Sequence, residues 1–557
     1  MKVFIFCLII VYWSFGFSQI DSRGSKPSEI ENPSGEKRAL IVGVSNYLEK
    51  SLKLNYADND AALFKNYLNQ IEGIPNENIQ LLLNENAAAL GIVSALKKLY
   101  NNLNSGDHLY IYFAGHGDVV DDFGEQEGFL LAADANASQE YYSGGVLSLK
   151  LLNTIIKKLS ENQVKVTLIL DACRSGFLFE EGTHKNMGTI QAMFENSTKI
   201  LSCGSNELSY ESGELNHGYF TYFLVKGLSG EADTNTDNSI IYRELDDYLY
   251  NNVNNLVSKK LNQSQTPVIR TKNDRAQFKA LKKENKIAFE RLSGEVKSTK
   301  QVAARGIDLD LKKKDFDGII LDFKKAIQNQ LYFGKSKAAY EIFKMASKKA
   351  ELPKTYLDKM ESTLLTTLSY EAQTLINAYI NESTALPSTK EFNKQSKHLE
   401  ICLELMGKDS FLYNRILASK LLLESYDTIK SKNYQKLRSA KSKLQTALKL
   451  EPRAAYIHNA LGDIYTMERL YDSAFYQYNK AKKLIGSWSK PDKSLSDNFL
   501  NQYKYEEAKQ LITNSLGTEG FDANLKLGAI NTKHGKYALA EDHYKSALKL
   551  QPNNAQV

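Results

Sequence analysis

The hydrophobic pattern of the chain changes once, near Arg270, and this change limits the fold more than any other feature. From Arg38 to this point, short apolar runs alternate with amphipathic stretches. Beyond it, amphipathic helical stretches continue without a strand pattern. Alternating strands and helices build a parallel sheet between helix layers. We therefore predict an α/β domain followed by an all-α domain.

The apolar runs of the first half predict five strands. Runs such as Tyr110–Phe113 and Val166–Leu170 are apolar at nearly every position, which indicates burial on both faces of the sheet. The predicted strands are Ala39–Val44, Ile79–Leu83, Leu109–Phe113, Val164–Leu170 and Lys199–Ser202. The predicted helices are Ala61–Leu68, Gly91–Leu103, Leu147–Leu159 and Tyr219–Leu228. We expect a largely parallel sheet with helices on both faces.

The N-terminal residues have the composition of a secretory signal. Lys2 precedes an apolar run from Val3 to Phe17, with small residues at Gly16 and Ser18. The run is shorter than the roughly 20 residues needed to span a bilayer, so we predict cleavage after Ser18, export to the periplasm or beyond the cell, and no membrane span in the mature chain. The predicted organisation is a signal peptide at 1–18, a linker at 19–36, the α/β domain at 37–272, a Lys-rich helical linker at 273–305 and the helical domain at 306–557.

An internal period runs through the second half and is clearest over 425–557. A small, an aromatic and a small residue recur in two sets, each preceded by a Leu-Gly pair 13 residues upstream of its first small residue. The sets are Ala474, Tyr478 and Ala481, and, 66 residues later, Ala540, Tyr544 and Ala547. The pattern resembles tetratricopeptide repeats, in which small residues lie where paired helices cross closely. Such arrays present concave surfaces, so the resemblance implies a module that binds a protein partner.

Two of the predicted strands are followed by groups that carry chemistry. One leads into Gly-His116-Gly117, and the other into Asp171-Ala-Cys173. Functional groups of a parallel sheet gather beyond the carboxyl ends of its strands. If the two strands are neighbours, about 4.8 Å apart, His116 can take the thiol proton of Cys173 and later protonate a leaving amine. The backbone amides of Gly117 and Cys173 are then the candidate oxyanion hole.

Together these motifs resemble the caspase-like clan of cysteine peptidases, in its metacaspase and paracaspase branch. His116 lies 57 residues before Cys173, and Asp171 stands where the caspase signature carries Gln. The resemblance covers about 37–272. It implies a caspase-type α/β sandwich and a cysteine endopeptidase with a His–Cys dyad that requires no cofactor. The alternative is a catalytically inactive domain of the same fold in an exported repeat-based adaptor or scaffold.

Acidic residues are the candidates for substrate binding. Asp171 should point the same way as Cys173, because residues i and i+2 of a strand share a side. A carboxylate in a partly buried cleft needs a positive partner, and the resemblance adds Asp60 and Glu207 to this pocket. We therefore predict cleavage after Arg or Lys. Alternatively, Asp60 is an acid in the first turn of a helix, where the helix dipole favours a negative charge, and Glu207 is a solvated acid in a loop.

A loop further along the chain has the spacing of a calcium site. Oxygen-bearing side chains occupy positions 1, 3, 5 and 12 of an EF-hand-type loop, and Asn238 replaces the usual Gly at position 6. The candidate metal ligands are Asp233, Asn235, Asp237, Ser239 and Glu244. A Ca²⁺ site and an Asx-rich turn before a helix both fit this pattern.

Charge and cysteine usage exclude several classes of protein. The 71 Lys and Arg against 65 Asp and Glu leave a net charge of +6 over 557 residues, too little to indicate a nucleic acid or an anionic membrane as partner. The cysteines at 7, 173, 203 and 402 lack CxxC spacing, which excludes a zinc ribbon and a disulfide framework. The expected partners are a protein or peptide substrate with Arg or Lys at the cleavage site, and a protein bound by the repeats.

Overall fold

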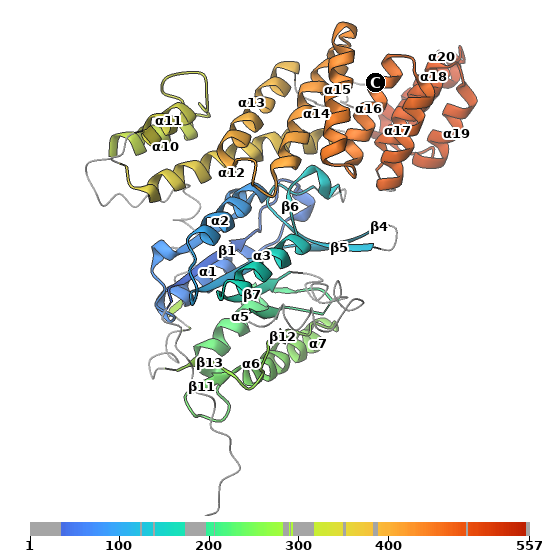
Figure 1. Cartoon of the computed structure of the whole chain (residues 1–557). Helices are drawn as coiled ribbons and strands as arrows, with labels where there is room; N and C mark the ends of the chain where they lie inside the picture. The colour runs from blue at the N-terminus through green and yellow to red at the C-terminus, as the bar shows by residue number, and fades with distance from the viewer. Residues whose placement is uncertain are drawn as a thin grey trace, which may run out of the picture.

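The computed structural model confirms the predicted fold class, a mostly parallel sheet with helices followed by a helical domain (Figure 1). The structure describes residues 35–122, 125–136, 140–172, 197–204, 207–281, 289, 291–292, 317–348, 352–381, 388–485 and 488–552. The predicted signal peptide, nearly all of the linker at 19–36, and Cys173 lie outside these residues.

A six-stranded sheet forms the centre of the α/β domain, in the order β12-β8-β7-β3-β1-β2. Its strands are β1 (Lys37–Gly43), β2 (Ile79–Leu83), β3 (His108–Ala114), β7 (Lys165–Asp171), β8 (Ser197–Leu201) and β12 (Val268–Arg270). All neighbours pair in parallel except β12, which is antiparallel to β8. The five strands predicted from apolar runs are all present, and β3 lies between β1 and β7.

Alternate side chains of the central strands pack into two separate hydrophobic cores, one on each face of the sheet. In β3, Leu109 and Ile111 join the core that contains α2 and α3, whereas Tyr110 and Tyr112 join the core that contains α1 and α5. Burial on both faces explains why the predicted strands are apolar at nearly every position. The helices of this domain are α1 (Ala57–Gln70), α2 (Ala89–Asn101), α3 (Leu149–Glu161), α5 (Tyr219–Lys226), α6 (Tyr242–Leu249) and α7 (Asn255–Leu261).

Three small sheets flank the central one. The first, β4-β5-β6, begins directly after His116 and forms the hairpin that projects beside the sheet in Figure 1. The strands of the small sheets are β4 (Gly117–Asp122), β5 (Glu125–Leu131), β6 (Val146–Ser148), β9 (Glu211–Ser212), β10 (His217–Gly218), β11 (Ser239–Ile241) and β13 (Gln277–Ala280).

The helical linker predicted at 273–305 is wrong at its beginning, because Gln277–Ala280 form β13, antiparallel to β11. Lys279 of this strand is buried, and its Nζ lies 2.8 Å from Glu72 Oε1. This carboxylate offsets the cost of removing the ammonium from water. A Lys-rich stretch by itself does not show that a carboxylate from another part of the chain will pair with one of its lysines.

The second half of the described chain is entirely helical. Its helices are α10 (Asp317–Gln328), α11 (Ala339–Lys348), α12 (Lys354–Ile380), α13 (Thr389–Met406), α14 (Tyr413–Ser431), α15 (Leu437–Leu450), α16 (Ala455–Met467), α17 (Tyr471–Leu484), α18 (Lys490–Asn501), α19 (Tyr505–Leu516), α20 (Phe521–Lys533) and α21 (Tyr537–Leu550). Within the described residues, no helix is both long and apolar enough to cross a membrane.

The repeated sequence motif has a direct packing cause. In the pair α16 and α17, a Cβ at Gly462 would lie 2.4 Å from the ring of Tyr478, and in α20 and α21 a Cβ at Gly528 would lie 2.6 Å from the ring of Tyr544. Glycine in the first helix therefore makes room for the tyrosine of the second. The small residue Ala474 is fully buried at the same crossing. These contacts confirm the prediction that the recurring small and aromatic residues lie where paired helices cross closely.

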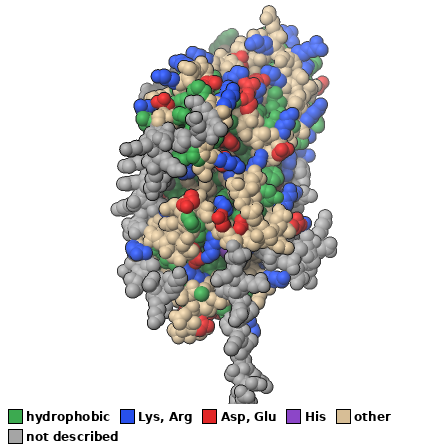
Figure 2. All heavy atoms as spheres, turned by 60° about the vertical axis from the view of Figure 1, so that its left-hand side comes forward, with side chains coloured by type: hydrophobic (Ala, Val, Ile, Leu, Met, Phe, Trp, Pro, Cys, Tyr) green, Lys and Arg blue, Asp and Glu red, His purple; other side chains and the backbone are tan. Residues whose placement is uncertain are grey.

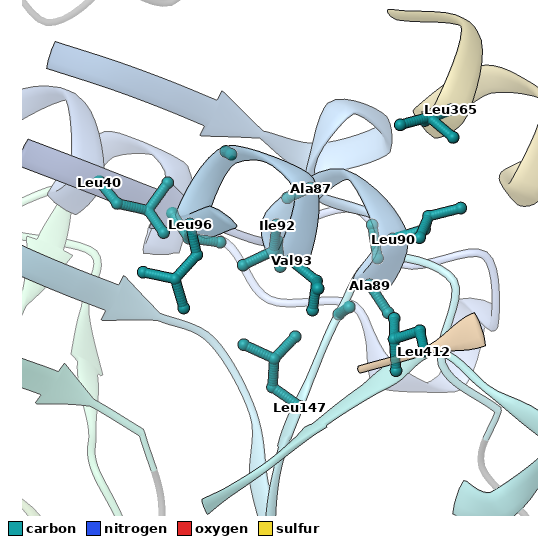
Figure 3. Packing of buried hydrophobic residues seen from close by; sticks show 14 of the residues in the cluster. Leu40, Ala87, Ala89, Leu90, Ile92, Val93, Leu96, Leu147, Leu365 and Leu412 are labelled. Atoms are coloured by element: carbon teal, nitrogen blue, oxygen red, sulfur yellow. The ribbon is translucent and has the colours of Figure 1, made fainter. Parts of the chain in front are cut away.

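The two halves share a hydrophobic core, because α12 packs on α2 (Figure 3). Leu90 of α2 lies near Leu365 of α12 and Leu412 of the helical domain in this core. A Cβ at Gly91 would lie 2.4 Å from Oγ1 and 3.2 Å from Cγ2 of Thr366, so only glycine admits this approach. Burying each leucine stabilises the contact by about 1.5–3 kcal/mol.

A buried carboxylate also joins the halves. Glu140, between β5 and β6, is 1% exposed, and its Oε2 accepts a hydrogen bond from the N–H of Ala455, the first residue of α16, at 3.1 Å. Burial raises the pKa of Glu140 to about 8, although this N–H and the charge of Arg415 act in the opposite direction. The side chain is therefore mainly protonated in the folded protein at neutral pH.

This pKa predicts how stability depends on pH. Folding raises the pKa of Glu140 from about 4.5 to about 8, so its contribution to stability is greatest below pH 4.5 and is lost as the pH rises to about 8. Glu140→Gln stays neutral, and we expect its free energy of unfolding at pH 9 to exceed that of the wild type by on the order of 5 kcal/mol. Thermal or urea unfolding at pH 5 and pH 9 measures this difference. Glu161→Gln, at an exposed site, is the control, and equal pH dependence in wild type and Glu140→Gln would contradict the prediction.

Candidate functional site

Strands β3 and β7 bring the predicted catalytic positions to one edge of the sheet. The strands pair with Ala114 opposite Asp171, and the N–H of Gly115 donates to the carbonyl oxygen of Asp171 at 3.1 Å. His116 follows Ala114 by two residues, and Cys173 follows Asp171 by two residues. Because Cys173 lies outside the described residues, the distance between its sulfur and His116 stays a prediction.

The loop after β1 holds the imidazole of His116. Nε2 lies 2.9 Å from the carbonyl oxygen of Leu52, and since a carbonyl oxygen only accepts, Nε2 carries the proton. Nδ1 is then the nitrogen that can accept a thiol proton. The backbone N–H of His116 donates to the Tyr47 hydroxyl at 2.8 Å, and the two rings lie 5.3 Å apart. The sequence offered no third group to orient the histidine, because the Leu52 carbonyl belongs to the backbone and has no sequence signal.

The surroundings of His116 favour the neutral imidazole. Burial lowers the pKa of His116, and this effect outweighs the hydrogen bond to Leu52 and the negative charges of Glu211 and Asp118, which raise the pKa. A neutral imidazole can act as a general base, whereas an imidazolium cannot. The geometry and the protonation state of His116 therefore both suit proton abstraction.

The two best-supported acids of the predicted pocket lie together beside this edge. Asp60 is in the first turn of α1, Asp171 ends β7, and both are buried. A Cβ at Gly218 would lie 2.9 Å from Asp60 Oδ2 and 3.1 Å from Asp171 Oδ2. Gly218 thus keeps the space between the two carboxylates free of a side chain.

Neutral donors and one histidine surround these carboxylates. Their partners are Gly218 N (3.0 Å) and His217 Nδ1 (2.8 Å) for Asp60, and Ser209 Oγ (2.6 Å) and Thr221 Oγ1 (2.7 Å) for Asp171. Among the residues that the structure describes, neither carboxylate is paired with Lys or Arg. No sequence pattern indicated that His217 and Asp60 are partners, because the two residues lie far apart along the chain.

Burial and a neighbouring negative charge disfavour the ionisation of both carboxylates. Burial raises the pKa of Asp60 well above its ordinary value, and the charge of Asp171 raises it further. Burial also raises the pKa of Asp171, against the hydrogen bonds from Ser209 and Thr221. Like charges in a site with little water repel strongly, and a cation between them favours the ionised form of both. The arrangement therefore suits a guanidinium or ammonium group.

Glu207, the third acid predicted for the pocket, is held by hydrogen bonds from the surrounding loops, and its part in substrate binding stays a prediction. Its carboxylate accepts hydrogen bonds from Gly204, Ser264 and Thr266, so it joins two loops. Glu211, four residues later, is the acid whose charge acts on both Asp60 and Asp171. Glu207 precedes β9 and Glu211 is the first residue of that strand, so the path of this segment decides which of the two charges lies near the aspartates.

The predicted metal ligands form a loop closed by its own hydrogen bonds. Asp233 accepts from the N–H groups of Asp237 and Asn238 at 3.2 and 3.3 Å, and Asn238 has φ of 63°. Glu244 accepts from the N–H of Ile241 at 3.1 Å at the start of α6. No group of three or more His, Cys, Asp or Glu side chains among the described residues is arranged to hold a metal ion. The calcium site stays a prediction.

Isothermal titration with CaCl₂ tests this loop directly. If the loop binds calcium, the wild-type protein gives a saturable heat that Asp233→Asn lacks, because the substitution removes the carboxylate at the first loop position. Asp472→Asn, in the first turn of α17, is the matched control. A wild-type protein without saturable heat has only an Asx-rich turn at this position.

Two other cysteines lie within the described residues, and both are buried. The Sγ of Cys203 is 3.4 Å from the carbonyl oxygens of Ala172 and Glu207. Cys402 packs in α13, and burial raises the pKa of its thiol. Buried thiols of this kind are poor nucleophiles, which leaves Cys173 as the candidate nucleophile of the α/β domain.

Comparison with known proteins finds one family match in each half of the chain. Residues 36–279 match the caspase domain family, and residues 435–487 and 494–555 match the tetratricopeptide repeat family. Metacaspase III c of Phaeodactylum tricornutum is 24% identical over 180 residues, which cover 30% of this chain and 53% of that protein. Metacaspase-1 of Plasmodium falciparum is 26% identical over 269 residues, which cover 44% of this chain and 42% of that protein.

The matched region spans about half or less of these curated relatives. Among solved structures, YrrB, a TPR protein with an unusual peptide-binding site, is 18% identical over 32% of this chain and 87% of its own, with a TM-score of 0.22. A score this low adds nothing to the fold assignment. The family matches establish a caspase domain distantly related to metacaspases, followed by C-terminal tetratricopeptide repeats.

Proposed function

We propose that this caspase domain, distantly related to those of metacaspases, is a cysteine endopeptidase that cleaves after Arg or Lys. The observation that carries the proposal is the parallel register of β3 and β7, in which Ala114 lies opposite Asp171. His116 and Cys173 each follow that pair by two residues. The orientation of His116 by Leu52 supports the same conclusion.

The proposed mechanism begins with proton transfer from the thiol of Cys173 to Nδ1 of His116. The thiolate attacks the carbonyl carbon of the scissile peptide bond, and the backbone amides of Gly117 and Cys173 stabilise the resulting oxyanion. His116 then protonates the leaving amine as the C–N bond breaks. Water, activated by the same imidazole, hydrolyses the thioester and regenerates the thiol.

The specificity part of the proposal rests on Asp60 and Asp171. A substrate guanidinium or ammonium group supplies the cation that these two buried carboxylates lack among the described residues. Arg can pair with a carboxylate through two parallel hydrogen bonds. An acidic substrate side chain would add a third negative charge and is rejected.

We propose that the helical repeats bind a partner or recruit substrate, and that the N-terminal segment directs export. On the face in Figure 2, Lys and Arg side chains are interspersed with Asp and Glu side chains. The net charge of only +6 over the whole chain favours a protein partner over a nucleic acid. The proposed peptidase requires no cofactor. Titration with CaCl₂ decides whether the protein also binds calcium.

An exported adaptor whose caspase domain is inactive is the competing proposal, and a thiol-reactive probe separates the two. In an active dyad, His116 generates the thiolate that reacts with the probe. We expect labelling of the wild type, none of Cys173→Ala, and labelling of His116→Ala slowed by about 10²–10⁴-fold. Mass spectrometry of the labelled peptide identifies the modified cysteine. Equal labelling rates for wild type and His116→Ala would favour the adaptor.

Fluorogenic peptides that differ only in the residue before the scissile bond test the specificity. We expect hydrolysis after Arg and Lys, and in Asp171→Asn we expect kcat/KM for Arg to fall by about 10–100-fold, because a hydrogen bond to a charged group contributes about 1.5–3 kcal/mol. Glu207→Gln is the control, since Glu207 joins two loops, and its Arg selectivity should match the wild type. Preference for Asp, or undiminished Arg cleavage by Asp171→Asn, would refute the pocket.

A further inference from the structure

A second hollow opens at the same edge of the sheet, beyond β1 and β2. Its volume is about 250 Å³, somewhat below the roughly 300–1,000 Å³ of sites that enclose a whole small-molecule ligand. It therefore has room for one large side chain or a short stretch of peptide. Tyr370 of α12 in the helical domain lines one side, and the α/β domain contributes the other lining residues, which are Asn46, Tyr47, Leu83, Asn84, Glu85 and Asn86.

The order of strands sets this hollow on a defined side of the proposed dyad. Along the edge, β7 leads to Cys173, β3 to His116, β1 to Asn46 and Tyr47, and β2 to Asn84. His116 therefore lies between the nucleophile's strand and the hollow. Tyr47 connects the two sites, because its hydroxyl accepts the N–H of His116 and its ring also lines the hollow.

The walls of the hollow are held in place. Asn84 Oδ1 accepts the N–H groups of Ser45 and Asn46 at 2.9 and 2.8 Å, and its Nδ2 donates to Asp58 Oδ2 at 3.2 Å. Asn84 adopts φ of 50°, a conformation that Asn tolerates better than most residues. These bonds tie the ends of β1 and β2 to α1. The lining is thus a built surface and not a gap between mobile loops.

The helical domain completes one wall. Tyr370 is half-buried against the shared core, and near the end of the same helix Asn381 Nδ2 donates to Glu49 Oε2 at 2.9 Å. Glu49 belongs to the loop that also carries Tyr47 and Leu52, the residues that hold His116. The cleft is therefore formed by both halves of the chain.

The chemistry of the lining indicates what binds there. Asn46 and Asn86 contribute side-chain amides and Tyr370 contributes a phenol hydroxyl, groups that can donate and accept hydrogen bonds, and the exposed carboxylate of Glu85 supplies a negative charge. No Lys or Arg stands among the lining residues. Such a surface favours a polar or basic side chain over an acidic one.

We propose that this hollow binds the substrate residues that follow the scissile bond, and that it selects basic over acidic side chains there. The inference rests on the proposed peptidase function. His116 must protonate the leaving amine, so the leaving segment departs on the His116 side of the nucleophile, where the hollow lies. Tyr370 makes the helical domain part of substrate recognition in addition to any partner that the repeats bind.

Paired peptides with Arg before the scissile bond, and either Lys or Glu in the two positions after it, test this assignment. We expect the wild type to cleave the Lys peptide with a kcat/KM about three- to five-fold higher than the Glu peptide, the range of one exposed charge pair. Glu85→Lys should reverse this preference, and Tyr370→Ala should reduce it. Glu77→Lys, the same charge change at the opposite end of β2, is the matched control and should keep the wild-type ratio.

A further substrate distinguishes failure of the subsite proposal from failure of the peptidase proposal. An Arg-coumarin amide has no residue after the scissile bond, so its hydrolysis by the wild type reports only the dyad and the Asp60–Asp171 pocket. Hydrolysis of this amide, with the same Lys-to-Glu ratio in wild type and Glu85→Lys, overturns the subsite and leaves the peptidase standing. If the wild type hydrolyses neither the amide nor the peptides, the peptidase proposal fails and the subsite fails with it.

Discussion

The parallel pairing of β3 with β7 is the constraint on which the rest of the structure depends. These strands form the middle of the sheet, and each is buried between two helix layers. Because parallel strands end at the same edge, their register also aligns the segments that leave them. One set of backbone hydrogen bonds therefore stabilises the core and brings the His116 and Cys173 segments to a common place.

Two buried carboxylates at this edge of the sheet lower the stability of the fold. Asp60 and Asp171 are buried near each other without a Lys or Arg partner in the described chain, and each has a raised pKa. Buried like charges destabilise a fold unless a ligand compensates them. The large apolar cores on both faces of the sheet tolerate this cost. A cationic group that enters such a pocket is bound favourably, because its charge stabilises the ionised form of both carboxylates.

The helical domain is packed against the caspase domain through a continuous core, not tethered to it by a linker alone. Gly91 allows α2 and α12 to approach closely, and Glu140 reaches the first turn of α16. Through Asn381 and Glu49 the same interface contacts the loop that orients His116. The helical domain is thus connected through packed elements to the edge of the sheet that carries His116.

The sequence by itself predicted five strands of the central sheet, the repeats and the residues of the candidate dyad. Runs of apolar residues have few ways to be buried, and the Gly–Tyr spacing of the repeats is a local packing rule. Local periodicity did not reveal strand β13, because Lys279 becomes buried only when Glu72 from a distant segment meets it.

Only the tertiary structure decided the finer features of the site. The Leu52 carbonyl that orients His116 is a backbone group that every residue possesses, so no residue type marks it. Whether the charge of Glu207 or that of Glu211 acts on Asp171 depends on the path of the segment that leads into β9. The hollow beside Tyr47 exists because α12 brings Tyr370 to that edge. Each of these features depends on contacts between segments far apart in the chain, whose positions are set by packing and not by local pattern.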